Sequence, residues 1–317
     1  MKIKHLLCFI ALCLFFTPGK AQQLSVMTLR NGATVYIWED KSKPDVFGMI
    51  AFKVGSVDDP EQYTGLAHYL EHVMFKGTQT IDALDWEKEK PIYEKIIAKY
   101  DERAALRDLA AREAVDKEIN DLTREAAQYA AGNEFSLLVD HMGGQGLNAS
   151  TGYDQTEYHN SFPPSQLEKW LEIYSERLID PVFRGFQTEL EAVYEEYNMY
   201  NDDRGSRMRE FIYEQAVGDP PSAPPIIGLP EHLKNPPLSK LLDFYNTWYG
   251  PQNMSIILVG NIDAKEAIPM IRDKFERVPR RAEIHREKKP VRQFKGRTEK
   301  SAKIFYYPML ALIYNGV

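Results

Sequence analysis

The chain has 317 residues, of which 44% are hydrophobic, 27% charged and 12% aromatic. This is ordinary globular composition, which excludes collagen-like, low-complexity and intrinsically disordered chains. The formal net charge of -7 argues against a nucleic-acid-binding protein. The length suggests about two domains, and no run after residue 21 is apolar for long enough to predict a membrane-spanning helix.

The first 21 residues have the pattern of a secretory signal peptide. Lys2 and Lys4 form a basic start, residues 6–16 are an apolar run too short to span a bilayer, and small residues lead to Ala21. We predict cleavage after Ala21. The alternative is a short buried N-terminal helix, which the order of basic flank, apolar core and small-residue exit disfavours.

Removal of this segment would take away both cysteines of the chain, Cys8 and Cys13. The mature chain would then form no disulfide and no cysteine-ligated metal site. Leu12 precedes Cys13, where a lipoprotein signal would have a small residue, so we expect no lipid anchor. An exported, disulfide-free protein of this size indicates a bacterial periplasmic location.

After this segment, the chain begins with predicted strands. Residues 24–29 and 33–38 are rich in strand-forming residues, and Asn31-Gly32 between them is the signal of a hairpin. Residues 46–54 form a third apolar run, and residues 62–75 have the pattern of a helix.

Residues 86–130 differ from the rest of the chain in composition. Most of them are Ala, Glu, Lys, Arg, Asp or Leu. Apolar residues recur there at three- and four-residue spacing: Ile92, Ile96, Tyr100, Val115, Ile119, Leu122 and Ala126. The pattern predicts one long helix or a helical hairpin with a narrow apolar stripe and a solvated charged face. A coiled coil that binds a partner is the alternative.

The rest of the chain mixes strands, helices and loops. Strands are predicted at 147–151, 156–162 and 254–259, and helices at 165–178, 189–201, 204–217, 238–249 and 264–275. Residues 219–237 are proline-rich and predict a loop, residues 278–300 are basic and predict a linker, and residues 304–314 begin a new strand-like run. Strands followed by several helices, without strict alternation, predict an α+β fold.

The sharpest motif is His68-Tyr69-Leu70-Glu71-His72, inside the predicted helix 62–75. His68 and His72 lie one turn apart on the same helix face, as two ligands of one metal must. Glu71 would lie beside that metal, where a carboxylate can accept a proton from metal-bound water. Zinc suits two histidines, a carboxylate and an open water position. The alternative is a helix that carries two histidines by chance, although this spacing is the inverted zincin pattern.

Residues 65–78 around this motif strongly resemble the metal-binding helix of the M16 peptidases, the pitrilysin, insulinase and mitochondrial processing peptidase family. Residues 146–151 with Tyr158, 167–182 and 244–260 are similar to further segments of that family. The resemblance implies a metallohydrolase domain with an antiparallel-rich sheet and packed helices. On this basis, residues 22–278 would be the N-terminal catalytic domain.

The family places its third ligand on a later helix, in the arrangement E-x-x-x-V-x-x-E. Residues 189–196 fit this arrangement with Val193 in register. The resemblance therefore implies that Glu196 binds the zinc and that Glu189, two turns earlier on the same face, orients a ligand or relays protons. Glu191 and Glu195 are the competing candidates.

The resemblance also implies zinc-dependent endopeptidase activity, with Glu71 as general base toward a zinc-bound water. Peptides or unfolded polypeptides would add to an exposed sheet edge that carries Asn148 and Ala149, although Asn148 has the alternative of a strand-end turn residue. A non-catalytic scaffold subunit of an M16-type complex is the rival function. A small-molecule metallohydrolase is a third, which the edge-strand resemblance disfavours.

The chain departs from the family in one spacing. His72 and Glu196 are 124 positions apart, more than the family usually has, and a helical insertion at about 86–135 would account for the excess. Residues 279–300 would then be a linker, and 301–317 the start of a truncated second domain. Family members close two such halves around the peptide, so we expect a second M16-type half in cis or in trans and doubt activity in isolation.

Overall fold

The computed structural model describes residues 23–218, 224–234, 236–286, 293–304 and 308–314. The proposed signal peptide, residues 1–21, lies outside these ranges, so its assignment stays a prediction. Among the described residues, no helix is both long enough and apolar enough to cross a bilayer.

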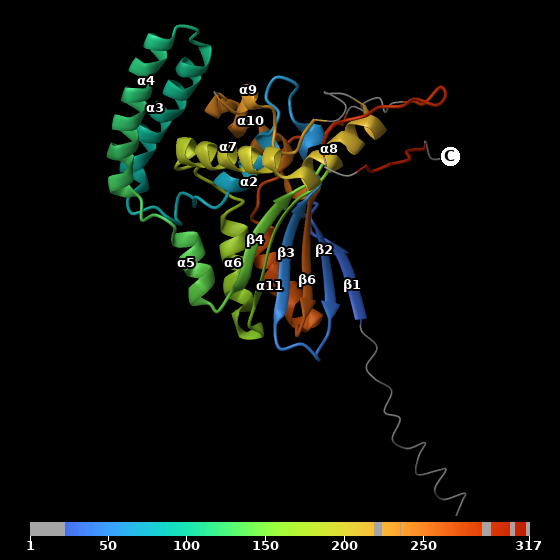
Figure 1. Ribbon diagram of the computed structural model, residues 1–317. Coiled ribbons are helices and arrows are strands. Elements are labelled where there is room, and N and C mark those ends of the chain that lie inside the picture. Colours follow the sequence, from blue (N-terminus) through green and yellow to red (C-terminus); the bar gives the residue numbers. More distant parts are fainter. Residues whose placement is uncertain (1–22, 219–223, 235, 287–292, 305–307, 315–317) are drawn as a thin grey trace, which may run out of the picture.

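Six strands in the described chain form one sheet, in the order β1-β2-β6-β3-β5-β4 (Figure 1). They are β1 (Gln23–Thr28), β2 (Thr34–Glu39), β3 (Val46–Phe52), β4 (Gln145–Thr151), β5 (Thr156–Phe162) and β6 (Met254–Gly260). Neighbouring strands are antiparallel except β2 and β6, which are parallel. The predicted α+β class with a mainly antiparallel sheet is therefore confirmed.

The predicted turn between β1 and β2 is formed at Asn31 and Gly32. Gly32 has a φ of 101°, a left-handed conformation that suits glycine. The side-chain amide of Asn31 donates to the carbonyl oxygens of Phe275 at 2.7 Å and Val278 at 3.1 Å. The hairpin is thereby tied to the end of α11 (Ala264–Phe275).

Two helices, α6 (Leu167–Glu176) and α11, pack on one face of the sheet (Figure 1). Alternate residues of β3, β5 and β6 are buried, which is the period of two expected of strands covered on one side. Gly48 of β3 lies against Trp170 of α6, where a Cβ atom would come within 2.5 Å of the indole ring. This close approach leaves Trp170 fully buried, with its ring nitrogen donating to Asn160 of β5 at 2.8 Å.

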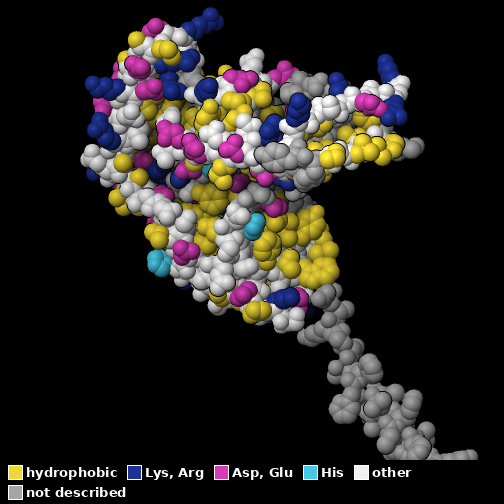
Figure 2. All heavy atoms as spheres, viewed as in Figure 1, with side chains coloured by type: hydrophobic (Ala, Val, Ile, Leu, Met, Phe, Trp, Pro, Cys, Tyr) yellow, Lys and Arg dark blue, Asp and Glu magenta, His cyan; other side chains and the backbone are white. Residues whose placement is uncertain are grey.

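The opposite face of β1 and β2 is apolar and exposed. Leu24 and Val26 are 51% and 55% exposed, and Tyr36 and Trp38 are each 37% exposed. The strand register pairs Leu24 with Trp38 and Val26 with Tyr36, so the four side chains form one patch, which is yellow in Figure 2. We call these four residues the apolar sheet face.

A second group of helices lies beyond one end of the sheet (Figure 1). It comprises α2 (Leu66–Val73), α7 (Phe186–Asp202), α8 (Arg204–Val217), α9 (Pro230–Leu233) and α10 (Leu238–Trp248). Helix α9 lies within the stretch 219–237 that the sequence predicted to be loop, a short helix that Pro230 starts at its first position. Residues 219–223 and 235 of that stretch lie outside the described residues.

Helix α2 is shorter than the predicted helix 62–75. It begins after Gly65, which has a φ of 89° and ends the preceding turn. The Asp59 carboxylate accepts from the amides of Gly65 at 2.7 Å and Ala67 at 2.8 Å, so it satisfies donors that the helix start leaves free. This cap fixes where the helix begins, and with it the direction of the HxxEH side chains.

The charged stretch after residue 86 is a helical hairpin, the second of the two predicted alternatives. Helices α3 (Trp86–Ala105) and α4 (Leu109–Ala126) run side by side and extend from the rest of the molecule (Figure 1). We call α3 and α4 the outer hairpin. A further helix, α5 (Glu134–His141), was not predicted; it buries Phe135 and Val139, too few apolar residues to show a period.

The strand predicted for residues 304–314 is wrong for its described part. Residues 304 and 308–314 form neither helix nor strand. Met309, Leu310 and Leu312 are 54%, 84% and 68% exposed. An apolar run becomes a strand only where a neighbouring strand takes its backbone hydrogen bonds, and the described chain provides none here.

Candidate metal centre

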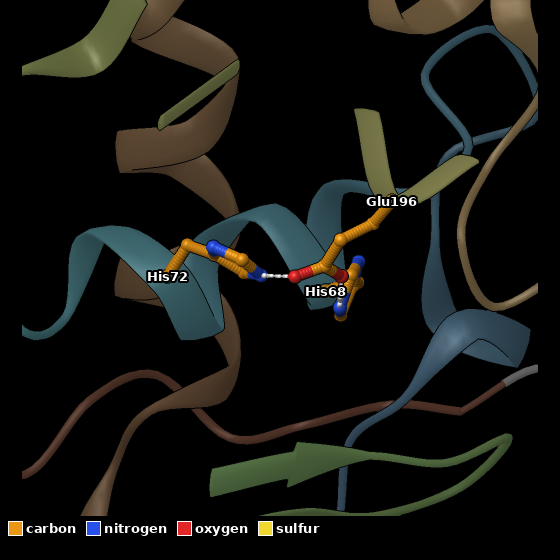
Figure 3. A group of neighbouring side chains, drawn as sticks. All are labelled: His68, His72 and Glu196. Carbon is orange, nitrogen blue, oxygen red and sulfur yellow. Dashed lines mark ion pairs between the residues drawn. The ribbon is translucent and has the colours of Figure 1, made fainter. Parts of the chain in front are cut away.

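Helices α2 and α7 bring three potential metal ligands together (Figure 3). The rings of His68 and His72 lie on the same side of α2, with centroids 4.9 Å apart. Glu196 of α7 faces both rings: its Oε2 lies 3.5 Å from Nε2 of His68, and its Oε1 lies 3.6 Å from Nε2 of His72. One ligand atom from each residue lies within 4.8 Å of the others.

The second ring nitrogen of His72 faces another carboxylate. Its Nδ1 lies 3.4 Å from Oε2 of Glu189, and Oε1 of Glu189 lies 2.6 Å from Nζ of Lys76. This contact fixes the ring and leaves Nε2 as the nitrogen that points to the ligand cluster, an arrangement common around metal-binding histidines.

Glu71 lies beside these residues on α2 and is only 8% exposed. Its Oε2 accepts a hydrogen bond of 2.6 Å from the Thr151 hydroxyl, at the end of β4. The bond occupies one carboxylate oxygen and so restricts the rotation of the group. This hydrogen bond links the edge of the sheet to the HxxEH helix.

The two histidines have opposite proton affinities. Burial, together with the nearby His72, lowers the pKa of His68 to about 4. Burial also acts to lower the pKa of His72, but its hydrogen bonds to Glu189 and Glu196 outweigh this effect and raise that pKa to about 9. At neutral pH the metal-free centre therefore holds one neutral imidazole and one imidazolium.

The pKa values of the nearby carboxyl groups are also shifted in opposite directions. Burial raises the pKa of Glu71, although the hydrogen bond from Thr151 opposes this effect. The hydrogen bonds from His72 are the largest cause of the lowered pKa of both Glu189 and Glu196. The carboxyl group suited to take up a proton is thus separate from the two that stay ionised.

The cluster of His68, His72 and Glu196 fits a zinc ion in its donor set. Two imidazole nitrogens and one carboxylate oxygen are the three protein ligands of many hydrolytic zinc sites. The two histidine nitrogens lie 3.5 and 3.6 Å from different oxygens of Glu196. One ligand atom from each residue lies within 4.8 Å of the others, close enough for all three to reach one ion. Glu196 is 39% exposed, so the cluster is open to solvent on its side.

The competing carboxylates lie elsewhere on α7. Glu191 accepts from the Gln187 side chain at 3.0 Å on the exposed surface, and Glu195 is exposed. Asn148 and Ala149 are on β4, which is an edge of the sheet, with Asn148 exposed and Ala149 partly buried. These positions agree with the predicted arrangement, while the roles of the residues remain proposals.

The sequence analysis did not identify three residues that contact the candidate ligands, the proposed base or the end of α2. Lys76 lies four residues after His72 but beyond the end of α2 at Val73, so helix spacing alone does not place it beside Glu189. Thr151 was within a noted strand, but nothing in the sequence shows which strand residue meets α2. The third, Arg177, is described next.

Arg177 is almost fully buried in an aromatic cage beneath α2. Its guanidinium carbon lies 4.4 to 5.5 Å from the ring centroids of Phe75, Phe135, Tyr158 and Tyr174. One of its nitrogens donates to the carbonyl oxygen of Met74 at 3.0 Å, directly after α2. A buried cation held by rings and by a helix-end carbonyl anchors the C-terminal end of the HxxEH helix.

Comparison with known families matches the chain to a family profile described as "Insulinase (Peptidase family M16)", over residues 34–90 and 120–228. The chain belongs to the M16 peptidase family. A second profile, described as "Peptidase M16 inactive domain", matches residues 237–312. Residues 91–119, most of the outer hairpin, fall between the matched parts of the first profile.

Relatives of this M16 chain are named zinc proteases. The probable zinc protease PqqL of Escherichia coli is 26% identical over 269 residues, which cover 81% of this chain and 23% of PqqL. The zinc protease PqqE of Helicobacter pylori is 24% identical over 254 residues, 79% of this chain and 46% of PqqE. The chain thus spans less than half the length of either relative.

Solved structures share the fold of this M16 chain. A protease from Helicobacter pylori has a TM-score of 0.63 at 21% identity and covers 85% of this chain and 53% of that one. The first half of the periplasmic protease PqqL from Escherichia coli has a TM-score of 0.63 at 24% identity, covering 86% and 50%. Pitrilysin also has a TM-score of 0.63, at 22% identity, covering 86% and 25%.

Zinc binding should strengthen as the pH rises toward about 9. His72, with a pKa of about 9 in the metal-free protein, must lose a proton before it can bind zinc through Nε2. His68, with a pKa of about 4, is already neutral and releases none. We expect the apparent zinc Kd to fall about tenfold per pH unit between about pH 6 and 8, measured by competition with a chelator. A Kd independent of pH over this range would contradict the assignment.

Thr151→Val should slow a reaction in which Glu71 acts as general base while leaving the zinc content unchanged. The variant keeps the shape of the side chain but removes the hydroxyl that holds Oε2 of Glu71. A hydrogen bond to a charged group contributes about 1.5–3 kcal/mol, so we expect kcat to fall about 10- to 100-fold. Thr247→Val, the same change on the surface of α10, is the control. Equal rates for both variants would show that Thr151 does not orient the carboxylate.

Proposed function

We propose that this chain carries the zinc-binding and base-bearing part of an M16 metalloendopeptidase. The observation that supports this most directly is the convergence of His68, His72 and Glu196, with Glu71 beside them on α2. The names of the relatives support zinc as the metal and proteolysis as the reaction.

The exposed edge of β4 is the proposed place for the peptide. An extended peptide can add to a sheet edge through main-chain hydrogen bonds, which give affinity with little demand on sequence. Asn148 and Ala149 lie on this edge, and Thr151 at its end contacts Glu71. A scissile bond held along β4 would therefore lie close to the proposed base.

In the proposed mechanism, the three carboxylates have different roles: Glu196 is a zinc ligand, Glu71 is the general base and Glu189 orients His72. Zinc held by His68, His72 and Glu196 would polarise the scissile carbonyl and acidify a water molecule. Glu71 takes up the water proton, for which its raised pKa suits it, and then delivers it to the leaving amine. Glu189 keeps the His72 ring oriented by accepting at Nδ1.

We further propose that a second M16-type half, in cis or in trans, completes the active enzyme. The alignments with PqqL include 86% of this chain. They include only 50% of the first half of PqqL and 26% of full-length PqqL. PqqL is described as a periplasmic protease, which supports export to the periplasm for this chain as well. The expected substrates are peptides or unfolded polypeptides.

The rival proposal is a scaffold subunit that keeps the fold without the chemistry. The complete set of ligand and base residues favours an enzyme, because a scaffold has no need of a paired base and ligand cluster. Zinc content and cleavage of a quenched fluorescent peptide, each with and without an added second half, separate the two proposals. A protein that binds zinc and cleaves no peptide under either condition would favour the scaffold.

Glu71→Gln should retain zinc and lose peptide cleavage. The amide has nearly the shape of the carboxylate but cannot accept the water proton, and general-base catalysis contributes about 10²- to 10⁴-fold in rate. Metal content by mass spectrometry and turnover of the quenched peptide measure the two effects. Turnover close to wild type would exclude Glu71 as the base.

Glu196→Ala should lose zinc, because it removes the carboxylate that faces both histidine rings. Glu195→Ala is the matched control, since that carboxylate is the next residue on α7 and is exposed. We expect less than one-tenth of wild-type zinc in Glu196→Ala and full zinc in Glu195→Ala after gel filtration. If Glu196→Ala keeps its zinc, another residue is the third ligand.

A further inference from the structure

The outer hairpin contacts the segment that leads into α7. Glu89, Tyr93 and Tyr100 are four and seven positions apart along α3, so they lie on one face of that helix. All three are buried. Their partners are residues 183–186, the segment immediately before and at the start of α7.

Glu89 and Arg184 form a two-armed ion pair. Nε of Arg184 lies 2.7 Å from Oε1 of Glu89, and Nη2 lies 2.8 Å from Oε2. Glu89 is 2% exposed and the Arg184 side chain 13%, so this pair is shielded from salt and water. The remaining nitrogen, Nη1, donates to the carbonyl oxygen of Lys76 at 3.2 Å, just after α2.

Two aromatic residues of α3 complete the contact. The Tyr93 hydroxyl accepts a hydrogen bond of 3.1 Å from the backbone amide of Phe183. The ring of Tyr100 lies 4.6 Å from that of Phe186, and Phe186 lies 5.0 Å from Tyr69 of α2. Phe186, the first residue of α7, is therefore packed between the outer hairpin and the HxxEH helix.

The start of α7 determines where its carboxylates lie. Glu196 is ten residues beyond Phe186, or about 15 Å along the helix axis, so a small tilt at the start moves Glu196 away from the histidines. Glu189 lies in the first turn, where it contacts His72 and Lys76. Lys76 is thus bound on both sides, by its carbonyl oxygen to Arg184 and by its Nζ to Glu189.

We propose that the outer hairpin is a brace for the metal centre, in which Glu89 and Tyr93 act as positioning residues that set how α7 holds Glu196. The inference rests on the proposed zinc site. Most of the brace lies in residues 91–119, between the matched segments of the family profile. Glu89 and Arg184, which form the ion pair, lie inside the matched segments.

The test compares two charge-removing variants of α3. Glu89→Gln breaks the ion pair to Arg184 at the base of the hairpin. Lys99→Ala is the control, because Lys99 pairs with Glu118 of α4 at 2.7 Å and so joins the two hairpin helices to each other. The zinc Kd is measured by chelator competition, and Co²⁺ alone is the spectroscopic probe of ligand geometry.

We expect Glu89→Gln to weaken zinc binding about tenfold or more, as outer partners of metal ligands do, and to change the visible absorption of bound Co²⁺. Lys99→Ala should match wild type in both measurements. A general loss of stability would not alter the spectrum of the molecules that remain folded. An unchanged zinc Kd and an unchanged Co²⁺ spectrum in Glu89→Gln would overturn the brace.

A second variant and a measurement on the metal-free protein distinguish failure of the brace from failure of the proposed zinc-dependent function. Tyr93→Phe removes only the hydroxyl that accepts from Phe183 and serves if Glu89→Gln does not fold. In the metal-free protein, either variant should speed amide hydrogen exchange in α7 while leaving α11 unchanged. Unchanged exchange in α7 would overturn the brace. A wild-type protein that binds no zinc would instead overturn the proposed function, and the exchange result would still decide the brace.

Discussion

The candidate metal centre depends on one contact, in which the His72 ring lies between two carboxylates of α7. Glu189 contacts Nδ1 and Glu196 faces Nε2, so this imidazole bridges α2 and α7 on both sides of its ring. Both carboxylates keep a lowered pKa because of this ring. Without a metal, the contact is an ion pair. Zinc would bind His72 through Nε2 once that nitrogen has lost its proton.

Residues from four other parts of the chain restrain these two helices or the segment that leads into α7. Asp59 caps the start of α2, and Arg177 binds the carbonyl that follows its end. Thr151 ties the β4 edge to Glu71, and Glu89 ties the outer hairpin to the entry of α7. The sheet thus contacts α2 at Glu71, and the outer hairpin contacts the entry of α7 at Arg184.

Local pattern was enough to predict part of this arrangement from the sequence. The spacing of His68 and His72 fixes their common face, because helix periodicity needs no tertiary information. Glu196 came from a family resemblance, since its approach to α2 depends on tertiary packing. The break between α3 and α4 was one of two predicted alternatives. The structure places it before Asp108, which caps α4 by accepting from the Ala111 amide at 2.8 Å.

The apolar sheet face has a consequence for how this chain behaves in solution. Four large apolar side chains on adjacent strands present a surface that water solvates poorly, and molecules that share it attract one another. The net charge of -7 opposes close approach, but only over the Debye length, about 10 Å at 0.1 M salt. Colloidal stability of the isolated chain should therefore decline as ionic strength rises, which favours low-salt buffers for its purification.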